Sequence, residues 1–425
     1  MRVLVVADGT RGDVQPMRVL ASALQDEGHA VNMAAPPGSR AAIEQEGLRF
    51  VPLAMDSEAL LHEMASAVVA GPRAVLRVTP RFLVASLESQ MRVLPELARD
   101  AEFILAGGVH LAVPSLAERY RVPWRSVVYS VTMLPSSWHP PILLPIGHAP
   151  RFVNWTGWQI TRWLLNRMLL APLNAERGRI GLPEIDEVAG YLQCPNPILA
   201  IDPELAPVAP HLRHLDIIGH LAPGDGDPLP GPVEDFLASG PPPLYFGFGS
   251  MTDPDAELTT RRAVEASQQA GCRLLLSRGW AGLGAGALPS HCLAIGPVSH
   301  TRLFPRMAAI VHHGGAGTTA AAARSGRPQL VVPHLADQFH FGAQVHSLGV
   351  APKPLRRTHL AADTLSARIH ELLSDPVMRE RARALGIRIA ARAPLRHASR
   401  LLTCPAPHRR PSVLPTKTIS VAPAG

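Results

Sequence analysis

Residues 312–319, His-His-Gly-Gly-Ala-Gly-Thr-Thr, constrain the fold of this chain more than any other segment. The four residues before them, 308–311, are apolar, which suits a short buried parallel strand, and residues 320–324 continue as a helix-forming run. The sequence therefore predicts a strand, a glycine-rich turn and a helix start. Glycines let the backbone approach a ligand, and the free N–H groups of a first helical turn bind phosphate. A tight turn that serves packing alone is the alternative interpretation.

Polar side chains near this turn strengthen the phosphate interpretation. His313 can donate a hydrogen bond or a proton to the same phosphate. Asp337 and Gln338 follow a strand-like run at residues 329–333, so we expect them to bind hydroxyl groups of whatever the phosphate carries. The turn lacks both the GxGxxG spacing of dinucleotide sites and the lysine of the Walker loop, which argues against nicotinamide chemistry.

Composition and charge exclude several classes of protein. The 425 residues, of which 47% are hydrophobic, are enough for two folded domains. Basic residues are dispersed despite a formal net charge of +7, so we expect no nucleic-acid partner. The four cysteines have neither metal-site nor disulfide spacing, which predicts no metal and fits a reducing cytoplasm. Neither a signal peptide nor a membrane-spanning run is expected.

Strand-like and helix-like segments alternate along the chain, which predicts the α/β class with parallel sheets covered on both faces. We expect a helix from Gln15 to Glu27 and two helices after Gln338. The predicted strands are residues 3–7, 30–34, 103–106, 124–129, 243–248, 273–277, 294–295, 308–311 and 329–333.

Proline, glycine and aspartate gather at residues 222–232, which predicts a linker. It divides an N-terminal domain of residues 1–221 from a C-terminal domain of residues 233–403. Residues 404–425 are rich in proline and basic residues, and we predict a disordered tail there.

Asp13 follows the first predicted strand, at the edge where open α/β sheets bind ligands. It can act as a general base for a bound hydroxyl group. It can equally be the N-cap of a helix that begins near Pro16. Spacing alone leaves both roles open.

Residues 135–175 combine a proline-rich loop with tryptophans, leucines and arginines at near-helical spacing. One interpretation is the wall of a pocket for a large apolar molecule, with Trp138, His139 and Trp158 as candidate contacts. A second is an amphipathic face that rests on a membrane. The third is an ordinary packed helix.

Several motifs together resemble the nucleotide-sugar site of family 1 glycosyltransferases. They are HHGGAGT at residues 312–318, RPQLVVP at 327–333 and ADQ at 336–338, with GTRGDVQP at 9–16 and SRGW at 277–280. The resemblance extends from Met1 to about Leu402 and is greatest to bacterial natural-product enzymes of the vancomycin group and their sterol-glucosyltransferase relatives. It implies an α/β GT-B fold, in which two Rossmann-like domains face each other across a cleft.

The resemblance also implies where the substrates bind. A nucleoside-diphosphate sugar would lie on the C-terminal domain, with Ser250 at the diphosphate and the stretches around Trp280 and Val298 at the nucleobase. Turn capping by Ser250 and plain packing of Trp280 are the alternatives. The implied donor-binding set is Arg11, Gly12, Ser250, Arg278, Trp280, Val298, His313, Gly315, Ala316, Gly317, Thr318, Asp337 and Gln338.

The implied reaction is transfer of a hexose or deoxyhexose, with inversion, to a hydroxyl group of a lipophilic acceptor such as a natural-product aglycone. Asp13 would be the base, His313 would stabilise the leaving diphosphate, and no metal or other cofactor would be needed. Asp337 is the second candidate for the base. Relatives with a histidine base pair it with a downstream aspartate that residues 107–110 lack, which leaves His110 as a minor acceptor-site candidate.

Three alternatives stay open from the sequence: a lipid or sterol glycosyltransferase at the membrane surface, a sugar-nucleotide epimerase, and an inactive nucleotide-sugar binder. We expect a cytoplasmic monomer or weak dimer, with peripheral contact to the inner membrane as an open possibility. Neither the sugar nor the choice between UDP and TDP follows from the sequence.

Overall fold

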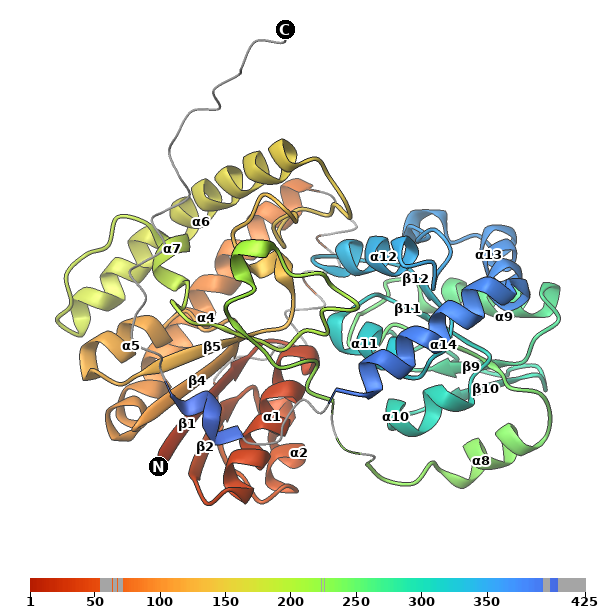
Figure 1. The fold of residues 1–425 in the computed structure, drawn as a ribbon, viewed down its shortest axis with the longest axis horizontal. Coiled ribbons are helices and arrows are strands. Elements are labelled where there is room, and N and C mark those ends of the chain that lie inside the picture. The colour runs from red at the N-terminus through yellow and green to blue at the C-terminus, as the bar shows by residue number, and fades with distance from the viewer. Residues whose placement is uncertain are drawn as a thin grey trace, which may run out of the picture.

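The computed structural model describes residues 1–53, 63, 67, 72–222, 224, 226–392 and 398–403. These residues form two α/β domains, each built around one sheet of parallel strands (Figure 1). The predicted α/β class is therefore confirmed. The predicted tail at residues 404–425 lies outside the described residues.

The N-terminal sheet has the strand order β3-β2-β1-β4-β5-β6-β7. Strand β1, an inner strand of this sheet, is buried on both faces: Val3 and Val5 pack with α1, while Leu4 and Val6 pack with α4. The strands are β1 Arg2–Asp8, β2 Ala30–Ala35, β3 Arg49–Pro52, β4 Phe103–Gly108, β5 Trp124–Val128, β6 Ile198–Leu199 and β7 Asp216–Ile217.

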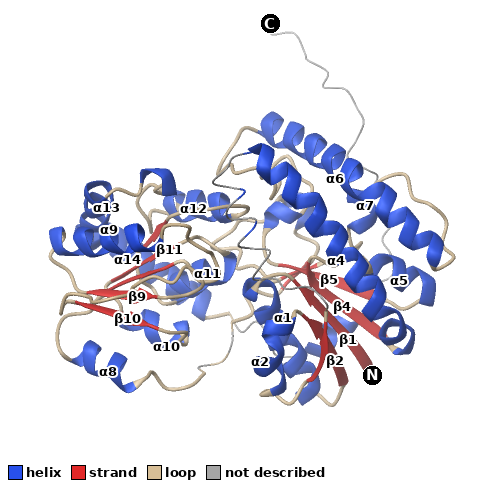
Figure 2. Cartoon of the chain, turned by 180° about the vertical axis from the view of Figure 1, so that it is seen from behind, coloured by secondary structure: helices blue, strands red, loops and turns tan. Residues whose placement is uncertain are grey.

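Helices cover both faces of this sheet, as a parallel sheet requires (Figure 2). One face packs on α1, and the other packs on α4 and α5 with the long α6 outside them. The helices are α1 Arg11–Asp26, α2 Arg40–Glu44, α4 Pro72–Asp100, α5 Val113–Tyr120, α6 Arg151–Arg179 and α7 Val188–Leu192, with 3₁₀ turns at Pro37–Ser39, Val131–Met133 and Pro210–Leu212.

The C-terminal sheet has the strand order β10-β9-β8-β11-β12. One face packs on α9 and α13, and the other packs on α8, α10 and α11. The elements are α8 Gly231–Ala238, β8 Leu244–Gly247, α9 Ala256–Gln269, β9 Leu274–Ser277, β10 Cys292–Ile295, α10 His300–Leu303, β11 Ala309–His312, α11 Ala316–Arg324, β12 Gln329–Val331, α12 Gln338–Ser347, α13 Ala362–Ser374 and α14 Pro376–Ala390, with 3₁₀ turns at Phe304–Arg306 and Arg357–His359.

Two predicted helix assignments are wrong. The first helix begins at Arg11 and not at Gln15, because Thr10 caps it and Asp13 lies inside its first turn. Three helices, α12, α13 and α14, follow Asp337 where two were expected.

The end of the described chain packs on the N-terminal domain, although residues 398–403 were assigned to the C-terminal one. The last 3₁₀ turn, Ala398–Leu402, contributes side chains to the core around α1. The Glu27 carboxylate accepts hydrogen bonds from the backbone N–H groups of Ala398 (2.6 Å) and Ser399 (2.9 Å). The end of the chain therefore ties the two domains together.

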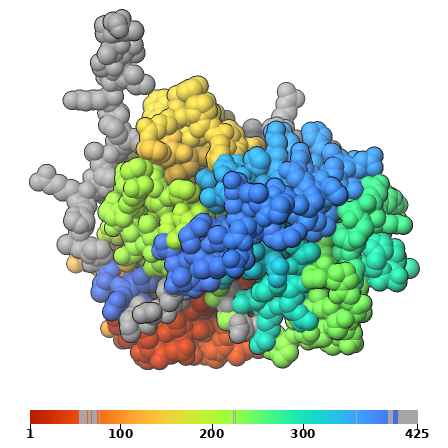
Figure 3. Space-filling view, turned by 45° about the vertical axis from the view of Figure 1, so that its right-hand side comes forward, coloured from red at the N-terminus to blue at the C-terminus, as the bar shows by residue number. Residues whose placement is uncertain are grey.

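The domains also touch directly beside the cleft. Phe341 of α12 packs in one apolar cluster with Val128 and Leu134 of the N-terminal domain. Arg392 and Glu204 form an ion pair of 2.6 Å between the domains. In the space-filling view, the yellow atoms of the α6 region adjoin the blue atoms of the C-terminal domain (Figure 3). No described helix has the length and apolar character needed to cross a membrane.

Candidate active site

The main candidate residues lie at the topological switch point of each sheet, on either side of which the strands are added in opposite directions. In the N-terminal sheet this point lies between β1 and β4, and in the C-terminal sheet between β8 and β11. Ligands of open α/β sheets bind at the carboxyl ends of the strands that flank such a point. Asp13 follows β1, and the turn at residues 312–319 follows β11, so each domain presents its main candidate residue at the expected place.

The carboxylate of Asp13 is held from one side by the start of α1. Its Oδ2 accepts hydrogen bonds from the backbone N–H of Thr10 at 2.8 Å and from the Thr10 hydroxyl at 3.0 Å. This is a capping box in which Thr10 is the N-cap and Asp13 is the N3 residue, so the N-cap role that spacing left open for Asp13 is wrong, although its side chain does cap the start of the helix. Both of these hydrogen bonds go to Oδ2, and no described residue hydrogen-bonds Oδ1.

The absence of a side chain at Gly9 leaves space for the Asp13 carboxylate. Gly9, with φ of +137°, has its Cα so close to Asp13 that an added Cβ would lie 2.4 Å from Oδ2. Burial raises the pKa of Asp13 to about 6, although the Thr10 hydrogen bonds oppose the shift and the charge of Asp8 adds to it. The group is therefore mostly ionised at pH 7 and close to the pKa that suits a general base.

The turn after β11 has the predicted form of strand, glycine turn and helix. Helix α11 begins at Ala316, and its N-cap, Gly315, offers no capping side chain to the first turn. The N–H groups of that turn are left for a ligand. His312 is structural: its Nδ1 accepts from the N–H of Gly314 at 3.0 Å, and its Nε2 pairs with Oε1 of Gln329 at 2.8 Å.

His313 lies between two glycine turns of the C-terminal domain. A Cβ at Gly315 would lie 2.5 Å from its Nε2, and one at Gly249 would lie 3.2 Å from its Cε1. Burial, with the neighbouring histidines 312, 334 and 300, lowers the pKa of His313 well below its usual value. The imidazole is neutral without a ligand, and its buried Nδ1 has no hydrogen-bond partner among the described residues. Its Nε2 lies beside Gly315, where it can give or take one hydrogen bond at the start of α11.

Asp337 of the C-terminal domain interacts electrostatically with groups of the N-terminal domain. It is the N-cap residue of α12, and its side chain is half-buried. Burial and then repulsion by the Asp13 carboxylate raise its pKa to about 7, while the Ser130 side chain of the N-terminal domain lowers it slightly. Two carboxyl groups, one from each domain, are therefore close enough to interact through their charges.

Gln338, the other predicted sugar contact, is buried and already engaged. Its Oε1 accepts from the backbone N–H groups of His334 at 2.8 Å and Leu335 at 3.1 Å. Its Nε2 contacts the Met251 sulfur at 3.3 Å. Gln338 thus fixes the loop that presents Asp337, and of the two side chains Asp337 is the more accessible.

The other predicted donor contacts lie on the loops that follow β8, β9 and β10. The N–H of Trp280 donates to the carbonyl oxygen of Gly249 at 3.0 Å, which joins two of these loops beside His313. Ser250 and Trp280 are partly exposed and Arg278 is exposed, whereas Val298 packs partly against the core near α8. The structure therefore brings these positions to the same edge of the sheet as His313.

Arg11 and His300 approach each other from opposite domains. Burial, followed by the charge of Arg11, lowers the pKa of His300 to about 3. The His300 ring stacks on Phe304 with centroids 4.2 Å apart. Gly12 is exposed next to Arg11. His300 was not among the predicted site residues, although its position at the end of the short loop that follows β10, at the carboxyl edge of the sheet, is a signal that identifies it.

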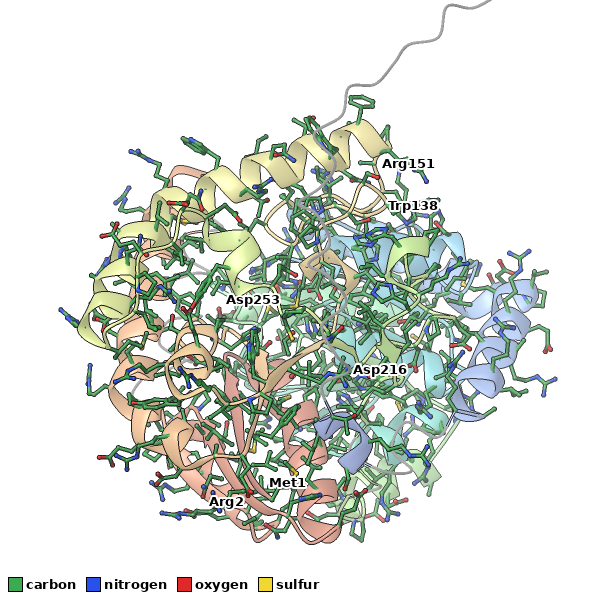
Figure 4. All side chains as sticks on the ribbon, turned by 60° about the vertical axis from the view of Figure 1, so that its left-hand side comes forward. Met1, Arg2, Trp138, Arg151, Asp216 and Asp253 are labelled. Atoms are coloured by element: carbon green, nitrogen blue, oxygen red, sulfur yellow. The ribbon has the colours of Figure 1, made fainter. Side chains whose placement is uncertain are left out.

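The acceptor-side candidates do not converge on one surface. His110 hydrogen-bonds the Gly108 carbonyl oxygen through Nδ1 at 2.9 Å. Trp158 is buried and donates from Nε1 to the His139 carbonyl oxygen at 3.3 Å, so it packs α6 on the preceding loop. The buried ring of His139 has no hydrogen-bond partner on either nitrogen. Trp138 is half exposed, with the Arg151 guanidinium 3.6 Å from its ring centroid (Figure 4).

Comparison with known proteins places the chain among sugar-transferring enzymes. Residues 3–117 match the glycosyltransferase family 28 N-terminal domain, and residues 281–399 match the C-terminal domain of erythromycin biosynthesis protein CIII-like proteins. The chain is 34% identical to vancomycin aglycone glucosyltransferase of Amycolatopsis orientalis, over 82% of this chain and 85% of that one. It is 29% identical to a sterol 3-beta-glucosyltransferase of Arabidopsis thaliana, over 89% and 64% of the two chains.

A solved structure gives the same fold. The glycosyltransferase VinC in complex with dTDP matches with a TM-score of 0.66 and 21% identity, over 92% of this chain and 96% of that one. Two facing Rossmann-like domains define the GT-B class, whose members take sugars from nucleotides. The chain belongs to the family 1 GT-B glycosyltransferases and is a nucleotide-sugar-dependent glycosyltransferase.

Proposed function

We propose that this enzyme transfers a hexose or deoxyhexose from a UDP- or TDP-sugar to a hydroxyl group of a lipophilic acceptor, with inversion at the anomeric carbon. One observation carries the proposal: the uncapped start of α11 beside His313 belongs to one domain, and the half-free carboxylate of Asp13 belongs to the other. Ala316, the first residue of α11, packs against the core cluster of the N-terminal domain to which Val14 of α1 also belongs.

The diphosphate would bind at the first turn of α11, from Gly315 to Thr318, with Ser250 on the adjoining loop. Negative charge grows on this group as the glycosidic bond to it breaks, and the N–H groups, the helix dipole and the His313 imidazole would stabilise that charge. These groups would do so without a metal ion. The dTDP in the VinC structure supports a nucleoside diphosphate as the ligand of this fold.

Asp13 would remove the acceptor proton as the acceptor oxygen attacks the face opposite the diphosphate. Its Oδ2 is fixed by Thr10, and Oδ1 is left for the acceptor hydroxyl. Asp337 is the second candidate; its pKa is raised by burial and by the charge of Asp13, and it lies at the start of α12 on the donor-binding domain. We assign Asp337 to the sugar hydroxyls instead.

Natural-product aglycones are the favoured acceptors, because the vancomycin aglycone enzyme is a relative with high coverage. The sterol 3-beta-glucosyltransferase relative keeps a membrane lipid or sterol as the second candidate. A sugar-nucleotide epimerase is less favoured. Isomerised donor in the absence of any acceptor alcohol would support it.

The test compares Asp13→Asn with His313→Ala. Asparagine keeps an oxygen for the Thr10 hydrogen bonds, so Asp13→Asn should bind donor normally and lose about 10²–10⁴-fold in turnover. His313→Ala should weaken donor binding and turnover together, by about 3 kcal/mol at the transition state. Thermal-shift titrations with UDP- and TDP-hexoses measure donor binding, and product formation with an aglycone panel measures turnover. Near wild-type turnover of Asp13→Asn would remove Asp13 from the role of base.

A further inference from the structure

The outward side of the first half of α6 is apolar. Among the described residues, nine large hydrophobic side chains are exposed, and six of them lie between Trp138 and Trp163. Four belong to α6 itself, and Phe152 and Trp163 are the most exposed, at 70% and 62%. These four, with the exposed Arg167, are called the α6 outer face: Phe152, Trp155, Ile160, Trp163 and Arg167.

Helix packing does not account for this face. At 3.6 residues per turn, its four apolar residues span about 140° of the helix circumference. Asn154, Trp158 and Thr161 lie on the opposite side, and these are the residues that pack inward. The helix thus buries one side in the protein and presents large apolar groups on the other. In the space-filling view the yellow α6 region stands at the edge of the molecule (Figure 3).

The segment that carries this face has charged residues of one sign only. No aspartate or glutamate occurs from Arg119 to Ala175, whereas α6 carries Arg151, Arg162 and Arg167. Arg162 pairs with Glu187 at 3.5 Å, and Arg151 stacks on Trp138. Tryptophan and phenylalanine flanked by arginine are typical of helices that lie in the interface of an anionic bilayer.

We propose that the α6 outer face docks the enzyme on the surface of an anionic lipid bilayer, with the helix axis parallel to the membrane. A second copy of this chain fits the face less well. A two-fold symmetric contact would place the α6 arginines of both copies close together without carboxylates from residues 119–175 to neutralise them.

Docking would place the membrane beside the loop that precedes α6. Trp158 and Asn154, on the inward side of the helix, hydrogen-bond carbonyl oxygens of this loop. An added Cβ at Gly147 of the same loop would lie 2.7 Å from Ala343 of α12 in the donor domain. A lipophilic acceptor could then enter from the bilayer; this consequence rests on the proposed function, whereas docking itself does not.

The experiment is flotation of the full-length protein with vesicles, without donor or acceptor. One set contains phosphatidylcholine and phosphatidylglycerol, and the other contains phosphatidylcholine alone. We expect binding to the anionic set that weakens as salt rises. Phe152→Ser/Trp163→Ser should lower it by about tenfold or more. The matched control, Val377→Ser/Ile387→Ser on α14, removes side chains that are 56% and 58% exposed and should bind like the wild type.

Two variants that each remove one positive charge separate the electrostatic contribution to vesicle binding from the hydrophobic contribution. Arg167→Gln should weaken binding to anionic vesicles by about fivefold, since one basic residue near an anionic surface contributes about that factor. Arg388→Gln, at an exposed position of α14, should not change it.

Three results would overturn the proposal. They are equal binding of Phe152→Ser/Trp163→Ser and the wild type, failure of the wild type to float with anionic vesicles at low salt, and a wild-type dimer that this double variant converts to a monomer. Because the readout is vesicle binding, an inactive enzyme that still floats would count against the proposed function only.

Discussion

The turn after β11 and the packing of α6 on its preceding loop are built in different ways. The turn is made of neighbouring residues: His312 accepts from Gly314, and the Thr319 hydroxyl donates to the Gly315 carbonyl at 2.9 Å. The α6 packing joins residues far apart in sequence, such as Trp158 and His139, and leaves His139, Asn154 Oδ1 and Thr161 Oγ1 buried without partners. A phosphate site of backbone groups is thus encoded locally, whereas an acceptor region depends on the path of a loop.

Of the tests of this comparison, the largest effect on turnover should come from one methyl group added to the turn after β11. Gly315 has φ of −61° and ψ of 145°, which alanine adopts without strain, yet its Cβ would press on the His313 ring. Gly315→Ala should therefore keep the fold and displace His313 from the diphosphate. We expect a loss of about 100-fold or more in turnover, comparable with removal of one charge-stabilising donor. Steady-state kinetics with the donor varied measures it.

Gly231→Ala is the matched control, because no atom lies within 4 Å of a Cβ built there. It should leave turnover unchanged. Wild-type turnover of Gly315→Ala would mean that His313 has room to move, and the turn would then be less tightly specified than its sequence suggests.

The sequence predicted the parts of the fold that have a local signal. Apolar runs at β1, β8 and β11 gave those strands to within one or two residues. β6 and β7 have two residues each, too few for any periodicity, and only their neighbours in the sheet define them. The start of α1 was placed too late because Pro16 was taken as an early helical residue, whereas Thr10 caps the helix.

The candidate site likewise contains features that the sequence predicted and features that have no local signal. The positions around His313 come together because they follow strands of one parallel sheet, which the alternation of elements predicts. The engagement of Gln338 by His334 and Leu335 depends on how the loop folds back, which no spacing rule reports. The exposure of Trp138 and the burial of Trp158 likewise depend on the phase of α6 relative to its loop.

A smaller effect on activity should come from Asp337, the carboxylate that interacts with the other domain. Asp337→Asn removes a charged hydrogen-bond acceptor for the sugar, so kcat/KM for the donor should fall about tenfold to hundredfold. Its pH profile is the sharper measurement. Activity should rise with pH, because the raised pKa of Asp13, about 6, keeps the base protonated below that value.

In the wild type the pair should titrate with apparent pKa values of about 6 and about 7. Asp337→Asn should lose the upper step, so the rise should have a single midpoint near pH 6. A variant profile that keeps a step near pH 7 would assign that step to another group and weaken the electrostatic contact inferred between the domains.

The smallest effect is on stability. The same change, threonine to valine, is made in the turn after β11 and in α6 to test the difference in hydrogen bonding between the two regions. Thr319→Val removes the hydroxyl that donates to Gly315 and should cost about 1 kcal/mol of unfolding free energy, because the buried bond is lost. Thr161→Val removes a buried hydroxyl without a partner, so it should be neutral or stabilise the protein by up to about 1 kcal/mol. Calorimetry should therefore show a melting temperature lower by about 2–4 °C for Thr319→Val and unchanged or higher for Thr161→Val. Equal destabilisation by both would mean that ordered water completes the hydrogen bonds of Thr161, and its hydroxyl would then be as well satisfied as that of Thr319.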